Sequence, residues 1–264
     1  MQALSHEVSV ASRAAERGAD VIRSAGLGAS EGMRAKEVAG DYVTEVDVAA
    51  ERAIVSLLEA EGGDVGVHGE ERGGADINDA WVVDPLDGTT NFAHGFPAVG
   101  VSVALVRGGR PVAGAICAPF LGQTWVAGRG EGAWLLGEEA EPCRLRVSDR
   151  APAQAVVGTG FPFRRKELLP RYLRTFEAAL SRFEDLRRPG AAALDLAWVA
   201  AGVFDGFFEL ALGPWDVAAG GLMIEEAGGV VTDWAGEDGW LQGDILAGPQ
   251  AVHAVLLDAV RSED

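Results

Sequence analysis

The residues best suited to chemistry follow a short apolar run in the first third of the chain. Residues 81–83 are WVV, which is typical of a strand, and the chain continues as DPLDGTT over 84–90. Pro85 holds the preceding residue extended and favours a turn, which would direct Asp84, Asp87 and the Leu86 carbonyl to one point. Oxygen ligands of this kind suit Mg²⁺. Gly88 and the N–H groups after it are typical of an anion site where a short helix begins.

A purely structural interpretation of the same motif is open at this point. Asp-Pro and Asp-Gly are common turn formers, and Asp87 could simply cap a helix. The motif alone does not separate a turn from a metal site. The rest of the chain has to decide between them.

The composition favours a globular protein of the cytoplasm. With 264 residues and 48% hydrophobic content, the chain can bury one large core or two modest ones. No apolar run approaches the ~20 residues of a membrane span, and the N-terminus, with Glu7 early, does not resemble a signal peptide. Cys117 and Cys143 lack metal-ligand spacing and are too few for a disulfide framework.

The net charge of −18 restricts the partners. It disfavours direct binding to nucleic acid or to anionic membranes, whereas a phosphorylated substrate stays compatible because divalent cations reverse the field locally. A basic cluster stands out, and it consists of Arg164, Arg165, Lys166, Arg171 and Arg174. A solvated helix face is the favoured interpretation of this cluster, and a second anion contact near the substrate is the alternative.

The elements around the central motif alternate in type. Thr44 and Asp47 form a pattern similar to a capping box, so an acid in a first helical turn is one interpretation of Asp47. Asp216, two residues after Pro214, is likewise an acid in the first turn of an expected helix. Glu70 and Glu71 follow an extended segment. We expect helices over 5–27, 47–58, 166–180, 190–199, 213–228 and 249–262, and strands over 65–71, 98–107, 111–117, 123–127, 132–135, 155–158, 203–210 and 230–231. One continuous domain over 1–264 is the simplest organisation, with a division into two lobes near residue 150 as the alternative.

In order along the chain, these segments resemble the inositol monophosphatase family of Mg²⁺-dependent, lithium-sensitive phosphatases. The matching segments are DYVTEVD at 41–47, GEE at 69–71, residues 81–92, GAA at 190–192, WDVAAG at 215–220 and EAGG at 226–229. Each segment is weak alone, but the ordered set is specific. The resemblance implies an α/β fold, a layered αβαβα sandwich, and a homodimer to which the apolar strands over 98–135 could contribute an interface.

The resemblance also implies roles for individual residues. The implied metal ligands are Glu70, Asp84, the Leu86 carbonyl, Asp87 and Asp216, with Glu70, Asp84 and Leu86 around one Mg²⁺ and the three aspartates around a second. Thr89 and Asp47 would orient the attacking water, with Glu70 close to that water. Gly88 and Thr89 would hold the phosphate, and the polyol hydroxyls would contact Asp87, Ala191, Ala192, Glu209 and Asp216.

The implied activity is hydrolysis of inositol 1-phosphate or a related small polyol phosphate by water that two metal ions activate. Thr90 favours this substrate class, because relatives that act on histidinol phosphate or adenosine bisphosphate tend to carry a bulky basic residue there. The basic cluster keeps fructose-1,6-bisphosphatase as an alternative. A non-catalytic binding partner in transcription complexes is an alternative of another class, which the complete acidic set disfavours. Lys36 is a surface charge or a neighbour of the acidic cluster, and His68 and His94 are structural or solvent-facing.

Overall fold

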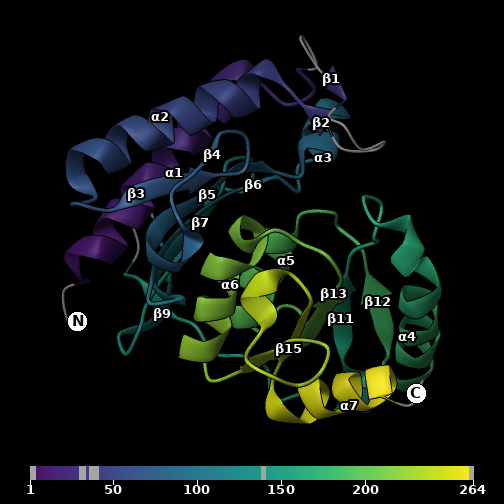
Figure 1. Cartoon of the computed structure of the whole chain (residues 1–264). Coiled ribbons are helices and arrows are strands. Elements are labelled where there is room, and N and C mark those ends of the chain that lie inside the picture. Colours follow the sequence, from purple (N-terminus) through teal and green to yellow (C-terminus); the bar gives the residue numbers. More distant parts are fainter. Residues whose placement is uncertain (1–3, 30–33, 36–41, 138–140, 262–264) are drawn as a thin grey trace.

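The protein is built of five layers in the order helix, sheet, helix, sheet, helix (Figure 1). The computed structural model describes residues 4–29, 34–35, 42–137 and 141–261, so Lys36 and Asp41 lie outside the described residues. The outer helices are α1 (His6–Ala25) and α2 (Glu45–Glu61) on one side and α4 (Leu169–Arg182) and α7 (Gln250–Arg261) on the other. The expected αβαβα sandwich is confirmed.

The first sheet has eight strands in the order β10-β9-β8-β7-β6-β5-β3-β4. Its strands are β3 (Gly66–Gly69), β4 (Gly73–Gly74), β5 (Ala80–Asp87), β6 (Gly100–Arg107), β7 (Arg110–Ala118), β8 (Gln123–Gly128), β9 (Gly132–Leu136) and β10 (Cys143–Arg144). The expected meander is β6 to β9. A separate two-stranded ribbon pairs β1 (Arg34–Ala35) with β2 (Tyr42–Val43).

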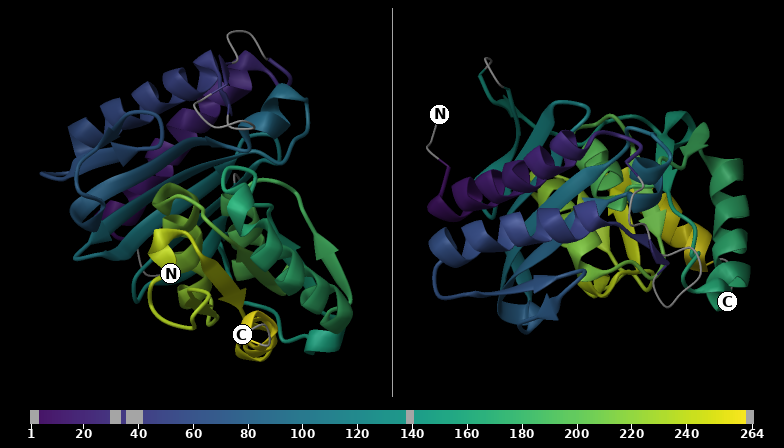
Figure 2. Two further views of the ribbon diagram at one scale, coloured as in Figure 1. Left: turned by 45° about the vertical axis from the view of Figure 1, so that its right-hand side comes forward. Right: turned by 90° about the horizontal axis from the view of Figure 1, so that it is seen from above.

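Helices cover the meander on both faces. Helices α1 and α2 lie side by side over one face (Figure 2), and α5 (Ala192–Ala200) and α6 (Pro214–Glu226) pack on the other. Nearly all of β6 and β7 is therefore buried inside the chain. This burial explains the apolar character of these two strands, and the dimer interface suggested for the meander stays a prediction.

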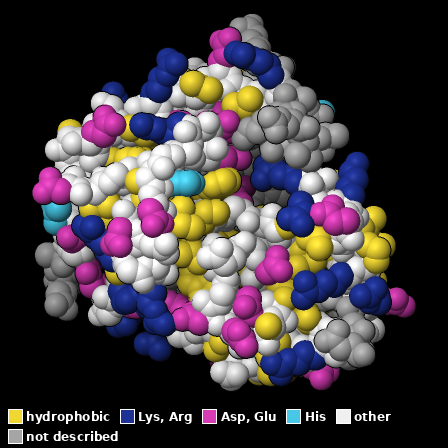
Figure 3. All heavy atoms as spheres, viewed as in Figure 1, with side chains coloured by type: hydrophobic (Ala, Val, Ile, Leu, Met, Phe, Trp, Pro, Cys, Tyr) yellow, Lys and Arg dark blue, Asp and Glu magenta, His cyan; other side chains and the backbone are white. Residues whose placement is uncertain are grey.

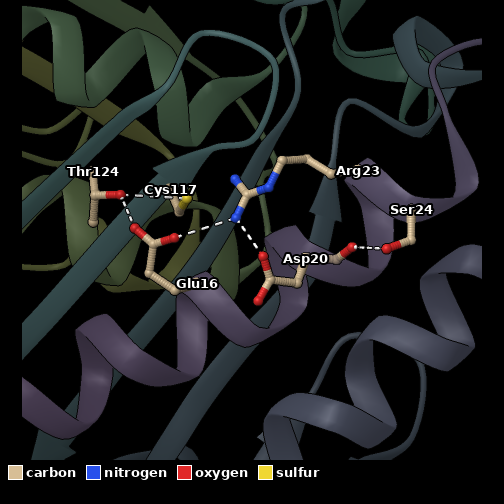
Figure 4. Close-up of polar contacts among 6 residues, drawn as sticks. All are labelled: Glu16, Asp20, Arg23, Ser24, Cys117 and Thr124. Carbon is tan, nitrogen blue, oxygen red and sulfur yellow. Dashed lines mark hydrogen bonds and ion pairs between the residues drawn. The ribbon is translucent and has the colours of Figure 1, made fainter. Parts of the chain in front are cut away.

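A small polar network links α1 to the first sheet (Figure 4). Thr124 on β8 hydrogen-bonds Glu16 of α1 and lies 3.4 Å from Sγ of Cys117 on β7. Burial raises the pKa of Cys117 to about 11, so its thiol stays protonated at neutral pH. Arg23 completes the network with ion pairs to Glu16 at 3.4 Å and to Asp20 at 2.7 Å. The network is structural and ties α1 to strands β7 and β8 of the sheet.

The second sheet has the strand order β12-β11-β13-β15-β14 and lies between α5 and α6 on one side and α4 and α7 on the other. Its strands are β11 (Val156–Thr159), β12 (Asp185–Arg187), β13 (Gly206–Glu209), β14 (Val230–Thr232) and β15 (Ile245–Gly248). Strands β12 and β15 were not predicted, because one is short and exposed and the other follows a loop. The strand expected over 203–210 begins only at Gly206.

Short elements complete the chain. Helix α3 (Thr89–Ala93) follows β5 directly, and single 3₁₀ turns occur at Ile77–Asp79, Pro152–Gln154, Lys166–Leu168 and Trp240–Gln242. The predicted capping box at the start of α2 is confirmed, with Thr44 and Asp47 each bonding the other's backbone. Among the described residues, no helix is both long and apolar enough to span a bilayer.

Candidate active site

A β-bulge near the end of β5 brings two carboxylates to the same side. Asp84 pairs with Ser102 of β6 and Asp87 with Gly100, so three steps on β5 face two steps on β6. In a regular strand, residues three apart point to opposite faces of the sheet. The extra residue of the bulge brings Asp84 and Asp87 to the same face. Pro85 suits this position because it has no N–H to donate to the ladder. The turn expected after Asp84 is therefore wrong: the strand continues through the bulge to Asp87.

Three aspartates from two distant segments meet at this bulge. Asp84, Asp87 and Asp216 each offer an oxygen, and these oxygens all lie within 4.8 Å of one another. Asp84 is only 1% exposed, and its Oδ1 accepts the Leu86 N–H at 2.9 Å. Asp216 reaches the cluster from the first turn of α6, where it accepts the Gly213 N–H. The structure thus assembles one dense group of negative charge.

Burial and mutual repulsion raise the pKa values of this group. Burial is the main cause for Asp84, whose pKa lies well above 3.8, and Glu70, Asp87 and Asp216 add to it. Burial and Asp216 raise the pKa of Asp87 to about 8. Burial and Glu70 raise the pKa of Asp216 to about 6. Carboxylates held this close without a compensating cation disfavour ionisation, and a divalent cation reverses that effect.

Glu70 lies beside the cluster because β3 runs parallel to β5. Gly69 pairs with Val83, and the Glu70 N–H donates to the Val83 carbonyl at 3.0 Å. The carboxyl ends of the two strands therefore lie at one edge of the sheet. The Glu70 carboxylate lies 3.7 Å from the guanidinium of Arg164.

Thr89 and Asp47 are in direct contact. The Thr89 Oγ1 lies 3.0 Å from Asp47 Oδ1 and 3.1 Å from the Leu86 carbonyl oxygen. Asp47 itself is fixed by the Thr44 N–H at 2.8 Å and by the Thr44 hydroxyl. Burial raises the pKa of Asp47, and its hydrogen bonds to Thr44 and Thr89 oppose that rise. The capping box of α2 and the start of α3 therefore form one unit.

The start of α5 is tied to the cluster through Asp87. Ala191 is the N-cap of α5 and has no side-chain acceptor, and Asp87 Oδ2 accepts the Ala193 N–H at 2.7 Å instead. Asn91 of α3 holds the segment before this helix, since its Nδ2 lies 2.9 Å from the Pro189 carbonyl. Ala191 and Ala192 consequently line the pocket above the aspartates.

Glu209 forms the opposite wall of the pocket from the end of β13. Its carboxylate lies so close to Gly160 that a Cβ there would come within 2.0 Å of it. Burial and Asp216 raise its pKa well above 4.5, and Arg188 opposes the rise. Glu209 is thus part of the site and not an exposed strand end.

The rim of the pocket is basic. Arg164, Arg165 and Arg188 line it, and the Arg188 guanidinium lies over the rings of Phe161 at 5.3 Å and Phe163 at 5.1 Å. The predicted basic cluster therefore divides in two. Arg171 belongs to α4 and stacks over Trp234 at 4.9 Å.

The pocket has a volume of about 340 Å³. Acidic residues form its floor and arginines its rim, and Figure 3 shows a hollow bordered by acidic and basic side chains on this face. All residues assigned to the site from the sequence line it except Asp47, which reaches it through Thr89. Sequence reasoning missed Arg188, although a basic pair directly before the Gly190 segment was a usable signal.

The two histidines singled out in the sequence lie outside this pocket. His68 stacks on Trp215 with ring centroids 6.0 Å apart, and its Nδ1 lies 2.8 Å from the Ala75 carbonyl. His94 is the C-cap of α3. Both have positions in the fold that need no ligand.

The layered fold, with this pocket between its layers, is that of a family of α/β phosphatases. The chain belongs to the inositol monophosphatase family, whose family model matches residues 3–264. It is 44% identical over 234 residues to the Nus factor SuhB of Pseudomonas aeruginosa, with 84% of each chain covered. It is 42% identical over 234 residues to the inositol-1-monophosphatase of Caulobacter vibrioides, with 86% of this chain and 90% of that protein covered.

Solved structures agree with this assignment. The crystal structure of the extragenic suppressor protein suhB from Bartonella henselae superimposes with a TM-score of 0.88 at 36% sequence identity. The match covers 98% of this chain and 100% of that chain. The relatives thus carry two kinds of name, one for a phosphatase and one for a Nus factor.

Proposed function

We propose that the protein is a Mg²⁺-dependent phosphomonoesterase that acts on inositol 1-phosphate or a related small polyol phosphate. The observation that carries this proposal is the group Asp84, Asp87 and Asp216, whose oxygens lie within 4.8 Å of one another at the floor of a pocket. Three buried carboxylates with raised pKa values repel one another when they are ionised and no cation is bound. A hard divalent cation between them would stabilise their ionised forms.

The residues present fit Mg²⁺, because all the donors are oxygens. Glu70, Asp84 and the Leu86 carbonyl would hold one ion, and Asp84, Asp87 and Asp216 would hold a second. When bound, the ions would supply positive charge against the phosphoryl oxygens.

The side chains around the ions would position the water and the substrate. Thr89 donates its hydroxyl proton to Asp47, which would leave its oxygen lone pairs free to accept a hydrogen bond from the attacking water. The N–H groups of Gly88 and Thr89 would hold the phosphate. Ala191, Ala192 and Glu209, together with Asp87 and Asp216, line the space in which the polyol would lie.

A second candidate substrate is a bisphosphate such as fructose 1,6-bisphosphate. The basic rim of Arg164, Arg165 and Arg188 favours it, because these three arginines line a pocket that has an acidic floor. Guanidinium forms strong hydrogen bonds with phosphate. The rim would contact the phosphate that is not hydrolysed.

The name Nus factor, carried by some relatives, supports a third candidate, a binding role in transcription complexes. The site favours the enzyme, since binding alone does not require a buried group of carboxylates. The homodimer, the lithium sensitivity and the cytoplasmic location implied by the family stay predictions.

The test is phosphate release by the purified protein with Mg²⁺ and with EDTA. Inositol 1-phosphate, fructose 1,6-bisphosphate, histidinol phosphate and adenosine 3′,5′-bisphosphate would be compared at equal concentration. We expect release only with Mg²⁺, and preference for the first substrate supports the main proposal. Preference for the second substrate supports the bisphosphate candidate, and no release from any of the four contradicts the enzyme.

A further inference from the structure

Glu51 is a buried carboxylate that the proposed mechanism does not use. It lies on α2 four residues after Asp47, which places the two acids on the same face of the helix. It is only 5% exposed. A buried carboxylate has a high desolvation cost, so its partners show what it does.

The hydrogen-bond partners of Glu51 are the two backbone N–H groups that follow Glu70. Its Oε1 accepts the N–H of Glu71 at 3.1 Å and the N–H of Arg72 at 3.4 Å. On the other side, the same oxygen lies so close to Gly69 that a Cβ there would be 2.1 Å away. The carboxylate therefore contacts the residue before Glu70 and the two residues after it.

The backbone of Glu70 itself contacts β5. Its N–H donates to the Val83 carbonyl at 3.0 Å, next to Asp84 in the chain. The backbone at Glu70 is thus held between β5 and α2. Because α2 also carries Asp47, the carboxylate of Glu51 fixes the Glu70 turn relative to the helix that orients Thr89.

We propose that Glu51 is a positioning residue, which holds the Glu70 backbone so that the Glu70 carboxylate can bind a divalent cation beside Asp84. The inference rests on the proposed function, because it assigns a metal to Glu70. It adds a residue to which the sequence analysis gave no role. It also gives Gly69 a specific reason to be glycine, namely the close approach of Glu51.

The experiment measures Mn²⁺ binding by electron paramagnetic resonance, with thermal unfolding of the metal-free protein recorded in parallel. The variants are Glu51→Ala, Glu51→Gln and Gly69→Ala, and Glu59→Ala is the matched control because Glu59 is an exposed acid on the same helix. Loss of the groups that orient metal ligands typically costs about 10–100-fold in affinity. We expect Glu51→Ala and Gly69→Ala to weaken one Mn²⁺ site at least tenfold.

The conservative variant, the control and a double variant have their own expected results. Glu51→Gln keeps an oxygen that can accept both N–H groups, so it should bind Mn²⁺ within about threefold of the wild type. The Glu59→Ala control should bind as the wild type does. In a Glu51→Ala background, Gly69→Ala should add little, because the carboxylate that its Cβ would displace is gone.

Several outcomes would overturn the inference. If the Glu51→Ala variant has a lower melting temperature but binds Mn²⁺ normally, Glu51 is a purely structural residue. The proposed function would still stand in that case. If Glu51→Ala fails to fold, normal Mn²⁺ binding by Gly69→Ala overturns the inference in the same way. A wild-type protein that binds no Mn²⁺ contradicts the proposed function, and this inference with it.

Discussion

The Thr89 hydroxyl oxygen lies 3.0 Å from Oδ1 of Asp47, a residue 42 positions earlier in the chain. Thr89 starts the helix after the bulged strand, and Asp47 lies in the first turn of α2, so the contact joins two elements at the pocket. A hydroxyl has one proton, and donating it to Asp47 leaves its lone pairs available for a water molecule.

This contact predicts a defect in turnover when the hydroxyl is removed. Thr89→Ala should lower kcat about 10²–10⁴-fold, which is typical for loss of proton transfer, and leave KM nearly unchanged. Thr89→Ser keeps the hydroxyl and should retain most of the activity. Steady-state kinetics on inositol 1-phosphate measure both variants. Wild-type kcat in Thr89→Ala would remove Thr89 from the mechanism.

The acidic cluster predicts how the stability of the metal-free protein depends on pH. Folding raises the pKa of Asp87 from 3.8 to about 8 and that of Asp216 to about 6, so the folded state binds more protons than the unfolded state between about pH 4 and 8. The stabilising contribution of these groups is fully present below about pH 4 and is lost as pH rises through 6 and 8. The melting temperature without metal should therefore be lower at pH 8 than at pH 6.

Added Mg²⁺ should reverse this trend. A cation that binds ionised carboxylates in the folded state stabilises it by mass action, and the gain increases with pH because protons compete less. Thermal unfolding at pH 6 and pH 8, with Mg²⁺ or EDTA, measures the effect. A Mg²⁺-induced shift that is larger at pH 6 than at pH 8 would contradict a carboxylate site.

The basic rim predicts which residue separates two substrate classes. Arg165→Ala should raise KM for fructose 1,6-bisphosphate about tenfold or more if the rim contacts a second phosphate, since hydrogen bonds to charged groups contribute about 1.5–3 kcal/mol. KM for inositol 1-phosphate should change less than threefold. Arg187→Ala is the control, because Arg187 is paired with Asp185 as Arg165 is with Glu167, but it does not line the pocket. If Arg165→Ala and Arg187→Ala change KM for fructose 1,6-bisphosphate equally, the rim has no role in specificity.

The backbone conformation of Gly88 predicts that any side chain at the start of α3 lowers the stability of the fold. Its φ is +89°, and a Cβ would lie 2.8 Å from the Ala98 carbonyl oxygen. Gly88→Ala should lower the free energy of unfolding by about 2 kcal/mol or more. Gly63→Ala is the matched control, since Gly63 has a φ of +77° with nothing within 4 Å of a Cβ. Urea unfolding that gives equal costs would show that the close contact at Gly88 is readily relieved.

Much of the fold was predictable from local sequence. The helix α1 begins after Ser5 and ends before Gly26, and the α2 capping box is visible as Thr44 and Asp47 three residues apart. The four strands of the meander are separated by Gly and Pro. Such signals are local, and a single chain segment is enough to show them.

The features that sequence reasoning missed depend on contacts between distant segments. The D-P-x-D spacing was interpreted as a turn, and only the pairing of β5 with β6 shows a bulge. Glu51 has no local motif, because its role comes from its contact with the Glu70 turn. The basic pair that contains Arg188 is visible in the sequence, but only the fold places Arg188 over Phe161 at the pocket. The D-P-x-D motif suggested a metal site for Asp84 and Asp87, whereas the ligand roles of Glu70 and Asp216 rested on the family resemblance. The structure adds that Asp84, Asp87 and Asp216 lie together.

The most direct test of the central claim is phosphate release from inositol 1-phosphate by the wild type and Asp84→Asn, each with Mg²⁺ and with EDTA. We expect the wild type to require Mg²⁺ and Asp84→Asn to lose about 10³-fold in rate, equivalent to about 4 kcal/mol of transition-state stabilisation. Metal-free Asp84→Asn should melt no lower than the wild type, since it removes one of several crowded buried carboxylates. Activity within tenfold of the wild type in a folded Asp84→Asn variant would contradict the assignment of this cluster as the catalytic metal site.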